Sequence, residues 1–347
     1  MLIVPPSRLT ILSVAYPFAP VLEDSVGGAE QILSKLDRAI VDAGHRSVVI
    51  AQEGSAVAGE LRSVDHVKGY ISDPLRAFVH GQVRQRISEA IRDCRPDLVH
   101  FHGIDFADYL PLQTMQCLVS LHLPLAWYDP GALRPQRAGT WLLPVSGSQV
   151  RLGAPGVKLL PPIENGVSIP KELEPKGDFA LSIGRICSEK GTHEAVDAAR
   201  AAGTGLLVAG EVFPYPEHRR YWRDVVRPRL DQARRWIGRI AGKRKQKLLG
   251  QAKCVLIPSR APETSSLVAM EALAAGTPVI AYPSGALPDI IEHGRTGFIV
   301  DGPREMAIAI RAVNDLDPLI CRTAASERFP LAKMTSAYLA QYAKLVA

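Results

Sequence analysis

Residues 178–211 read DFALSIGRICSEKGTHEAVDAARAAGTGLLVAGE, and this stretch decides the fold class. Asp178–Arg185 is a short apolar run typical of a buried strand. A polar loop with Gly191 follows it, and a helical pattern then continues to Gly203 before a second apolar run at 205–211. A strand, a helix and a second strand in this order form a βαβ unit, which predicts a parallel sheet.

The amino-terminal part of the chain has the same order of elements. An apolar run at Leu9–Pro17 leads into a loop with Gly27 and Gly28, a helical pattern covers 29–43, and a second strand is expected at 47–52. Further buried strands are predicted at 97–103, 116–122 and 141–146. The first half therefore predicts a parallel sheet of its own.

After residue 211 the alternation of helices and strands continues. Helices are expected near 221–233, 245–252 and 266–275, and strands at 236–240, 254–259 and 278–282. The end of the chain has the apolar spacing of an amphipathic helix, at about 328–347.

These patterns predict an α/β protein with two Rossmann-like, doubly wound domains that face each other across a deep cleft. The first domain is expected at 1–160, a linker at 161–177 and the second domain at 178–327, with the terminal helix packing back on the first domain. The Pro-rich joint 156–178 is the expected hinge. Ligands of such sheets bind beyond the carboxyl ends of the strands, so functional residues are expected in the loops that follow strands.

The positive charge of the chain is concentrated in one segment. The 347 residues carry a formal net charge of +6, yet residues 219–247 alone hold twelve Lys or Arg against two Asp, so the remainder is slightly acidic. Apolar residues recur through this segment at roughly helical spacing, which favours a solvated helix face that steers anionic ligands. No nucleic-acid partner is expected, and contact with an anionic membrane surface is left open.

The cysteines and the apolar runs indicate a cytoplasmic protein. The five cysteines are widely spaced and form no CxxC pair, as is typical of reduced thiols. The amino terminus does not have the pattern of a secretion signal, and no apolar stretch approaches the ~20 residues that span a bilayer.

The loop at 184–192 has the composition of a diphosphate site. Arg185 and Lys190 place two cations after a strand, and the helix that begins near Gly191 adds the positive end of its dipole and its free N–H groups.

A second candidate segment, Pro262–Pro278, follows the next buried strand. Glu263 precedes a helix that Thr264, Ser265 or Ser266 can cap, and Glu271 lies roughly 7–8 Å along the axis from Ser266. The helix is apolar nearly all round, so a merely solvated glutamate at 271 would be unusual. This order of groups matches a nucleotide sugar. The first carboxylate would hold the sugar hydroxyls, the backbone N–H groups the diphosphate, and the second carboxylate the ribose hydroxyls.

From about Leu9 to Ala340 the sequence resembles the GT-B-fold, retaining glycosyltransferases of family 4. The motifs that carry the resemblance are GGAE (27–30), ENGV (164–167), GRICSEKG (184–191), the E-x7-E pair Glu263 and Glu271, EALAAGTPVIA (271–281) and IIEHGRTGFIV (290–300). Six motifs in the family's order are far more specific than any one of them. The fold that the resemblance implies is GT-B.

The resemblance also assigns roles to individual residues. It implies that His122 and Glu263 are catalytic, that His122 lies near the reacting sugar, and that Glu263 contacts the donor sugar. The residues expected to bind the donor are Gly27, Gly28, Arg185, Lys190, Ser266, Leu267 and Glu271. His102 and Glu30 are expected on the acceptor side. The chain departs from the family at Thr264–Ser266, where most members carry Phe-Gly or a similar pair, which leaves the donor-sugar preference open.

The predicted reaction is transfer of a sugar from a nucleoside diphosphate to a glycan, a lipid-linked or a small-molecule acceptor, with retention, without a cofactor and without an obligatory metal. Arg185, Lys190 and the helix starts would stabilise the departing diphosphate. Two alternatives stay open: a GT-B-fold sugar-nucleotide epimerase, and a catalytically silent subunit that binds a nucleotide sugar or a glycan.

Other signals have simpler interpretations. His100 and His102 share one side of a strand, but no third metal ligand is near them in sequence. The DLD at 315–317 resembles a metal-binding DxD but is expected to end a helix. No strand is followed by GxGxxG, and the chain contains no GxSxG, which argues against an oxidoreductase and an α/β-hydrolase.

Overall fold

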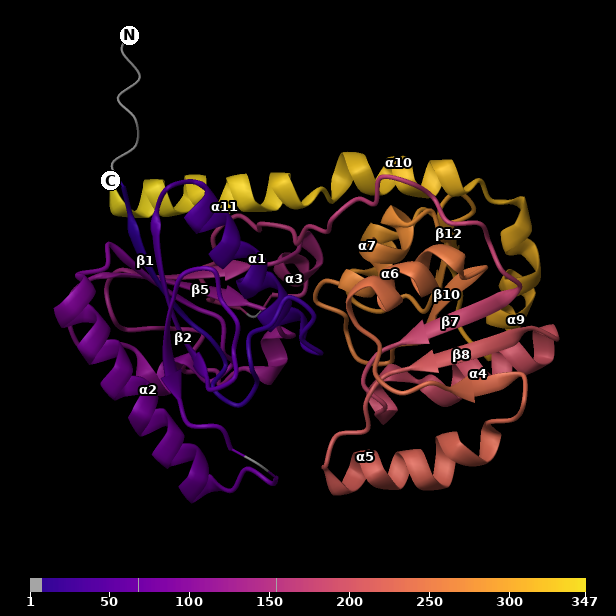
Figure 1. The fold of residues 1–347 in the computed structure, drawn as a ribbon, viewed down its shortest axis with the longest axis horizontal. Helices are drawn as coiled ribbons and strands as arrows, with labels where there is room; N and C mark the ends of the chain where they lie inside the picture. Colours follow the sequence, from indigo (N-terminus) through magenta and orange to yellow (C-terminus); the bar gives the residue numbers. More distant parts are fainter. Residues whose placement is uncertain (1–7, 68, 154) are drawn as a thin grey trace, which may run out of the picture. The chain divides into compact units, whose positions relative to one another are not determined.

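The computed structural model describes residues 8–67, 69–153 and 155–347, which form two compact units (Figure 1). Unit 1 comprises Met1–Glu164 together with Ala332–Ala347, and unit 2 comprises Asn165–Leu331. The boundary between the units lies inside the Pro-rich joint 156–178. Each unit contains one six-stranded sheet, and all strand pairings among the described residues are parallel, so the predicted α/β class is confirmed.

Unit 1 is a Rossmann-like sheet with the strand order β3-β2-β1-β4-β5-β6. Its elements are β1 (Thr10–Val14), α1 (Gly28–Asp42), β2 (Arg46–Gln52), β3 (Glu60–Val64), α2 (Asp73–Cys94), β4 (Leu98–Phe101), η1 (Phe106–Tyr109), β5 (Gln116–Leu121), η2 (Leu125–Trp127), β6 (Thr140–Pro144), α3 (Gly147–Arg151) and most of α11 (Leu331–Val346).

Alternating side chains of the central strands bury the two faces of this sheet against different helices. Val48 and Ile50 of β2 belong to one apolar cluster with Val83 of α2, whereas Val49 belongs to a separate cluster with Leu33 of α1. Because successive side chains of a strand point to opposite faces, α1 and α2 cover opposite sides of the sheet. This arrangement explains why the strands are apolar on consecutive residues.

The terminal helix α11, yellow in Figure 1, is attached to unit 1 by buried hydrogen bonds. The hydroxyl of Tyr342 lies 2.9 Å from Nδ1 of His100 on β4, and that of Tyr338 lies 2.9 Å from the hydroxyl of Ser120 on β5. Both tyrosines are fully buried. The last sixteen residues thus complete the core of the first unit, although the second unit separates them from it in sequence.

Unit 2 repeats the same topology, with the strand order β12-β11-β10-β7-β8-β9. Its elements are β7 (Phe179–Ile183), η3 (Ser188–Lys190), α4 (Thr192–Ala202), β8 (Gly205–Ala209), α5 (Pro216–Tyr221), the π-helical turn η4 (Trp222–Val226), η5 (Arg227–Arg229), β9 (Arg234–Trp236), α6 (Gly242–Gln251), β10 (Cys254–Ile257), α7 (Leu267–Ala274), β11 (Val279–Ala281), α8 (Leu287–Ile290), β12 (Gly297–Ile299), α9 (Pro303–Ala312), η6 (Val313–Asp315) and α10 (Pro318–Arg328). Helices α4 and α9 share the apolar cluster on one face of the sheet, and α7 packs against α10.

The structure corrects the prediction for the basic segment. The helix expected at 221–233 begins earlier, at Pro216, and ends at Arg229, and the strand expected at 236–240 is β9 at Arg234–Trp236. Arg234 pairs with Leu206 and Trp236 with Val208, at the edge of the sheet. An edge strand has one open side and accommodates charged residues, so its apolar pattern is weak.

Six helices and strands were missed altogether: β3, α2, α3, α8, β12 and α10. The turn expected at the DLD is present, since Asp315 ends η6, and the carboxylate of Asp317 accepts a hydrogen bond of 2.8 Å from the N–H of Leu319 at the start of α10.

The five cysteines are buried and unbridged. Among the described residues, no helix has the length and apolar character needed to cross a membrane.

Candidate active site

The first group of predicted site residues lies where β4 and β5 end. His102 and His122 follow these neighbouring parallel strands, and Nδ1 of His102 lies 3.0 Å from Nε2 of His122, with the rings stacked. His100, on β4, also belongs to this group: its ring centroid is 4.0 Å from that of His102, and its side chain is fully buried. The three imidazoles form one polar cluster at the carboxyl edge of the first sheet, in which His100 and His102 are buried and His122 is half-buried.

Burial keeps these imidazoles neutral. Loss of solvation lowers the pKa of His122 to about 4 and the pKa values of His100 and His102 well below the usual range for histidine. A neutral ring has one N–H donor and one acceptor, so one of His102 and His122 donates to the other. His122 is therefore suited to hold a ligand by a hydrogen bond and is a poor proton acceptor at neutral pH.

We expect the free energy of unfolding to fall as the pH decreases from 6.5 toward 4. The unfolded state protonates His122 near pH 6.5 but the folded state only near pH 4, so the stabilisation is fully present above pH 6.5 and is lost below it. His122 alone contributes about 3 kcal/mol across this window. Urea unfolding at a series of pH values measures the effect.

The control for this prediction compares two asparagine variants. His122→Asn should flatten the pH dependence, whereas His66→Asn, at an exposed position, should leave it as in the wild type. Equal pH dependence in wild type and His122→Asn would contradict the buried neutral imidazole.

The predicted acceptor-side residues are both buried. His102 is 3% exposed, and its Nε2 has no hydrogen-bond partner among the described residues, while Glu30 is 7% exposed. The carboxylate of Glu30 packs against Gly27, the N-cap of α1. A Cβ placed on Gly27 would lie 1.9 Å from Oε2 of Glu30. A side chain at position 27 would therefore displace the carboxylate of Glu30 from the start of α1, where Gly28 is the first helical residue.

The second group of predicted residues lies at the carboxyl edge of the sheet of unit 2. Lys190 ends the loop after β7, and its Nζ is 2.5 Å from Oε1 of Glu263, in the loop after β10. The Glu263 side chain is only 12% exposed. The close approach of the two loops depends on Gly191, whose φ is +62° and whose Cβ position would lie 2.2 Å from the carbonyl oxygen of Pro258.

Arg185 lies in the same loop and contacts an aromatic ring. Its guanidinium is 5.9 Å from the ring centroid of Phe213, in the segment after β8. This is a cation–π distance. Sequence reasoning missed Phe213, and the only signal for it was its position in a loop after a strand.

Helix α7 begins beside Glu263. Ser266 is its N-cap and makes no side-chain cap hydrogen bond in the described chain, and Leu267 is the first helical residue. The first N–H groups of a helix have no partner within it, so the start of α7 is suited to an anion. The expectation that a hydroxyl caps this helix is wrong for Ser266.

Glu271, eight residues after Glu263, has an unexpected partner. Nζ of Lys245 on α6 lies 2.5 Å from Oε2 of Glu271, and the two side chains are only 16% and 19% exposed. The contact is an ion pair by distance but lacks hydrogen-bond geometry, since Oε2 of Glu271 has no hydrogen-bond donor among the described residues.

Lys245 belongs to the basic segment 219–247, so one cation of that segment lies against the predicted donor-binding residue Glu271. Lys245 was missed because nothing in the sequence indicates that α6 lies beside α7.

The loop after β11 holds Glu263 in place. The N–H of Ala286 donates a hydrogen bond of 2.7 Å to the carbonyl oxygen of Glu263. Gly285 has a φ of +58°, and a Cβ there would lie 2.2 Å from the same oxygen. The backbone of Glu263 therefore packs directly on Gly285, another contact that the sequence did not indicate.

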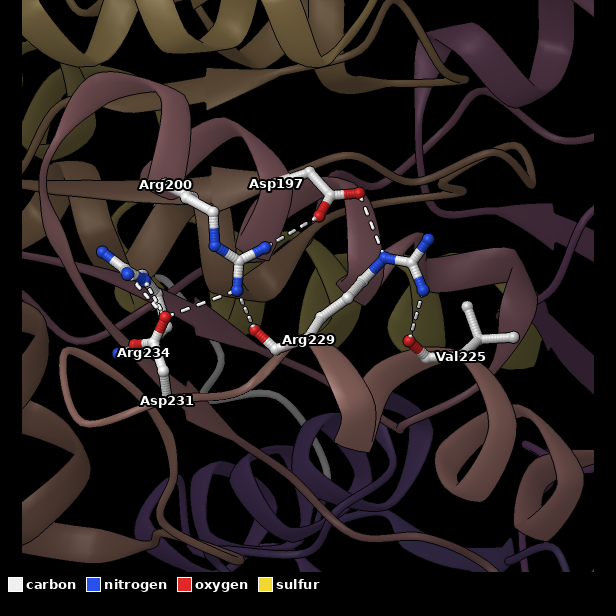
Figure 2. Close-up of polar contacts among 6 residues, drawn as sticks. All are labelled: Asp197, Arg200, Val225, Arg229, Asp231 and Arg234. Carbon is white, nitrogen blue, oxygen red and sulfur yellow. Dashed lines mark hydrogen bonds and ion pairs between the residues drawn. The ribbon is translucent and has the colours of Figure 1, made fainter.

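Part of the basic segment forms a structural network on the surface (Figure 2). Asp231 pairs with Arg234 at 2.5 Å and with Arg200 of α4 at 3.4 Å. Asp197 of α4 accepts from Arg229 at 3.1 Å, and Arg200 also donates to the carbonyl oxygen of Arg229. These arginines tie α4 to the start of β9, which accounts for part of the positive charge without a partner molecule.

Comparison with known proteins identifies the family. The model of the family described as "Glycosyl transferases group 1" matches residues 168–316, and that of "Glycosyltransferase Family 4" matches residues 26–144. The glycogen synthase of Mycobacterium tuberculosis is 27% identical over 89% of this chain and 87% of its own length. The D-inositol 3-phosphate glycosyltransferase of Corynebacterium kroppenstedtii is 46% identical over a shorter stretch, 19% of this chain and 15% of its own.

Solved structures share the fold over nearly the whole chain. AviGT4, a glycosyltransferase involved in avilamycin A biosynthesis, has a TM-score of 0.72 at 23% identity, covering 98% of both chains. Anabaena HepE in complex with UDP and glucose has a TM-score of 0.72 at 18% identity, covering 96% of this chain and 99% of its own. The two Rossmann-like units and these likenesses define the GT-B fold. The chain belongs to the group 1, family 4 glycosyltransferases and is an enzyme of the hexosyltransferase type.

Proposed function

We propose that the protein transfers a hexosyl group from a nucleoside-diphosphate sugar to a hydroxyl of a glycan, a lipid-linked or a small-molecule acceptor, with retention of configuration. The observation that carries the proposal is the contact between Lys190 and Glu263, with Glu271 and Lys245 further along α7. The solved structures of HepE with UDP and with UDP-glucose support a UDP-hexose as the first donor to test.

The proposed donor site orders the parts of the ligand along α7. Arg185, Lys190 and the start of α7 hold the diphosphate, Glu271 binds the ribose hydroxyls, and Glu263 orients the sugar. During transfer the bond from the anomeric carbon to the diphosphate oxygen breaks, and its electron pair leaves with the diphosphate. The fixed cations stabilise that developing charge, a role that other transferases give to a metal ion. We therefore propose that the transfer needs no metal.

On the side of unit 1, we propose that His122 contacts the reacting sugar and that Gly27 and Gly28 approach the diphosphate. His122 acts as a neutral hydrogen-bonding group because burial lowers its pKa to about 4. The buried ring of His102 fixes its orientation through the 3.0 Å hydrogen bond. We also propose that the enzyme is cytoplasmic, which its five unbridged cysteines support.

Calorimetric titration with UDP, GDP and dTDP tests the donor site. We expect Lys190→Ala and Glu271→Ala each to weaken binding of the preferred diphosphate by roughly 10- to 100-fold, because a hydrogen bond to a charged group contributes about 1.5–3 kcal/mol. Lys253→Ala is the control, since Lys253, 16% exposed against 31% for Lys190, is also largely buried but pairs with Asp178 at the opposite edge of the sheet. Unchanged affinity in both site variants would refute the donor-site assignment.

Product analysis tests the reaction itself. Nuclear magnetic resonance of the product with an accepted hydroxyl acceptor is expected to show the anomeric configuration of the donor. Turnover without added Mg²⁺ or Mn²⁺ is expected to equal turnover in their presence. Conversion of the nucleotide sugar to an epimer in the absence of acceptor would favour the epimerase alternative instead.

A further inference from the structure

Three potential metal ligands meet at the loop between β7 and α4. Cys187 and Glu189 lie in this loop, and His218 is on α5, which follows β8. One ligand atom from each of the three side chains lies within 4.8 Å of the other two. They are the one such group among the described residues, and none of them has a role in the proposed transfer reaction.

The local contacts leave the group able to accept an ion. Nδ1 of His218 is buried and has no hydrogen-bond partner among the described residues. Its ring is held between Phe213, stacked at 6.3 Å, and Tyr215, edge-on at 5.2 Å. Cys187 is buried, and its thiol makes a long contact, 3.7 Å, to the carbonyl oxygen of Arg185 and interacts with the carboxylate of Glu189, which is exposed and gives access from solvent.

The chemistry of the three ligands selects the ion. A thiolate and an imidazole exclude Mg²⁺ and Ca²⁺, which take oxygen ligands, and they suit Zn²⁺. The thiolate and the carboxylate together carry two negative charges, so a dication would leave the group close to neutral beside Arg185. Three protein ligands would leave one coordination position of a tetrahedral ion for water or another ligand.

We propose that Cys187, Glu189 and His218 form a Zn²⁺ site that fastens the loop carrying Arg185 and Lys190 to α5. The site is separate from the transfer chemistry, which is proposed to need no metal. It rests on the proposed function in one respect: the bound ion would rigidify the loop that is expected to bind the diphosphate. An ion bound to the folded state alone also raises the melting temperature.

The test titrates the full-length protein, stripped of metal by a chelator, with Zn²⁺ in competition with a chromophoric chelator. We expect one ion per chain and a higher melting temperature in its presence. Cys187→Ala and His218→Gln are each expected to weaken binding by about tenfold or more. With Cd²⁺ as the probe, the wild type should show the ultraviolet charge-transfer band of a cadmium thiolate, and Cys187→Ala should lack it.

Cys321→Ala is the matched control, because Cys321 is also buried and its thiol also lies 3.7 Å from a backbone carbonyl oxygen, that of Thr296. This variant should bind Zn²⁺ like the wild type. His218→Gln, at a half-buried position, keeps the test decisive if Cys187→Ala folds poorly. Absence of binding in the wild type, or equal binding in wild type and both site variants, would overturn the proposal, whatever the outcome for nucleoside diphosphates.

Discussion

Glu263→Gln is expected to lower kcat by about 10²- to 10³-fold, the loss that follows removal of one preorganised electrostatic group from an active site. The carboxylate of Glu263 is 12% exposed and lies 2.5 Å from Nζ of Lys190. Glutamine keeps the shape but removes the negative charge that, in the proposed donor site, faces the sugar as positive charge develops on it. The rate of UDP release from the sugar donor, with and without an acceptor, measures the effect.

Binding of the nucleoside diphosphate should change in the opposite sense. Without the carboxylate, the charge of Lys190 is no longer partly neutralised by an ion pair, so UDP should bind Glu263→Gln at least as tightly as the wild type. Glu305→Gln is the control, because Glu305 accepts a hydrogen bond from the N–H of Asp301 at the start of α9 and has no part in the proposed site. A kcat within about threefold of the wild type would remove Glu263 from the chemistry.

The sequence predicts the sheets well because their strands are buried on both faces. Runs such as 97–103 and 254–259 are largely apolar on consecutive residues, as strands covered on both faces are, and both coincide with central strands. The loops that follow such strands must lie at one edge of the sheet. The approach of Lys190 to Glu263 therefore follows from topology, although the two residues are 73 positions apart.

The missed features depend on packing that leaves no local pattern. Helix α2 buries a stripe that includes Val79, Val83 and Ile87, but polar residues dominate the rest of its 22 residues, so it did not stand out as a helix. Strand β9 is charged because it is an edge. Lys245 reaches Glu271 only because α6 packs beside α7, and a contact between two helices has no signature in either one alone.

Gly285→Ala is expected to lower kcat, although Gly285 has no side chain that could contact a substrate. The backbone of Gly285 is left-handed, at φ +58°, and a Cβ there would lie 2.2 Å from the carbonyl oxygen of Glu263. The same oxygen accepts a hydrogen bond from the N–H of Ala286, which holds the two segments together. Because the new methyl group would overlap the oxygen, either the loop after β11 or Glu263 has to move. A displacement of about 1 Å at an active-site residue can cost 10²-fold in rate, and we expect a loss of kcat of that size.

Gly294→Ala separates this effect from backbone strain. Gly294 is also left-handed, at φ +76°, but nothing lies within 4 Å of its Cβ position. Both variants therefore lose about 1–2 kcal/mol of stability from the conformation alone, which urea unfolding measures. Only Gly285→Ala should also lose activity while UDP still binds, because the displaced residue, Glu263, is the one proposed to orient the sugar. If the two variants retain the same kcat, the position of Glu263 does not depend on its contact with Gly285, and the role proposed for the loop after β11 is wrong.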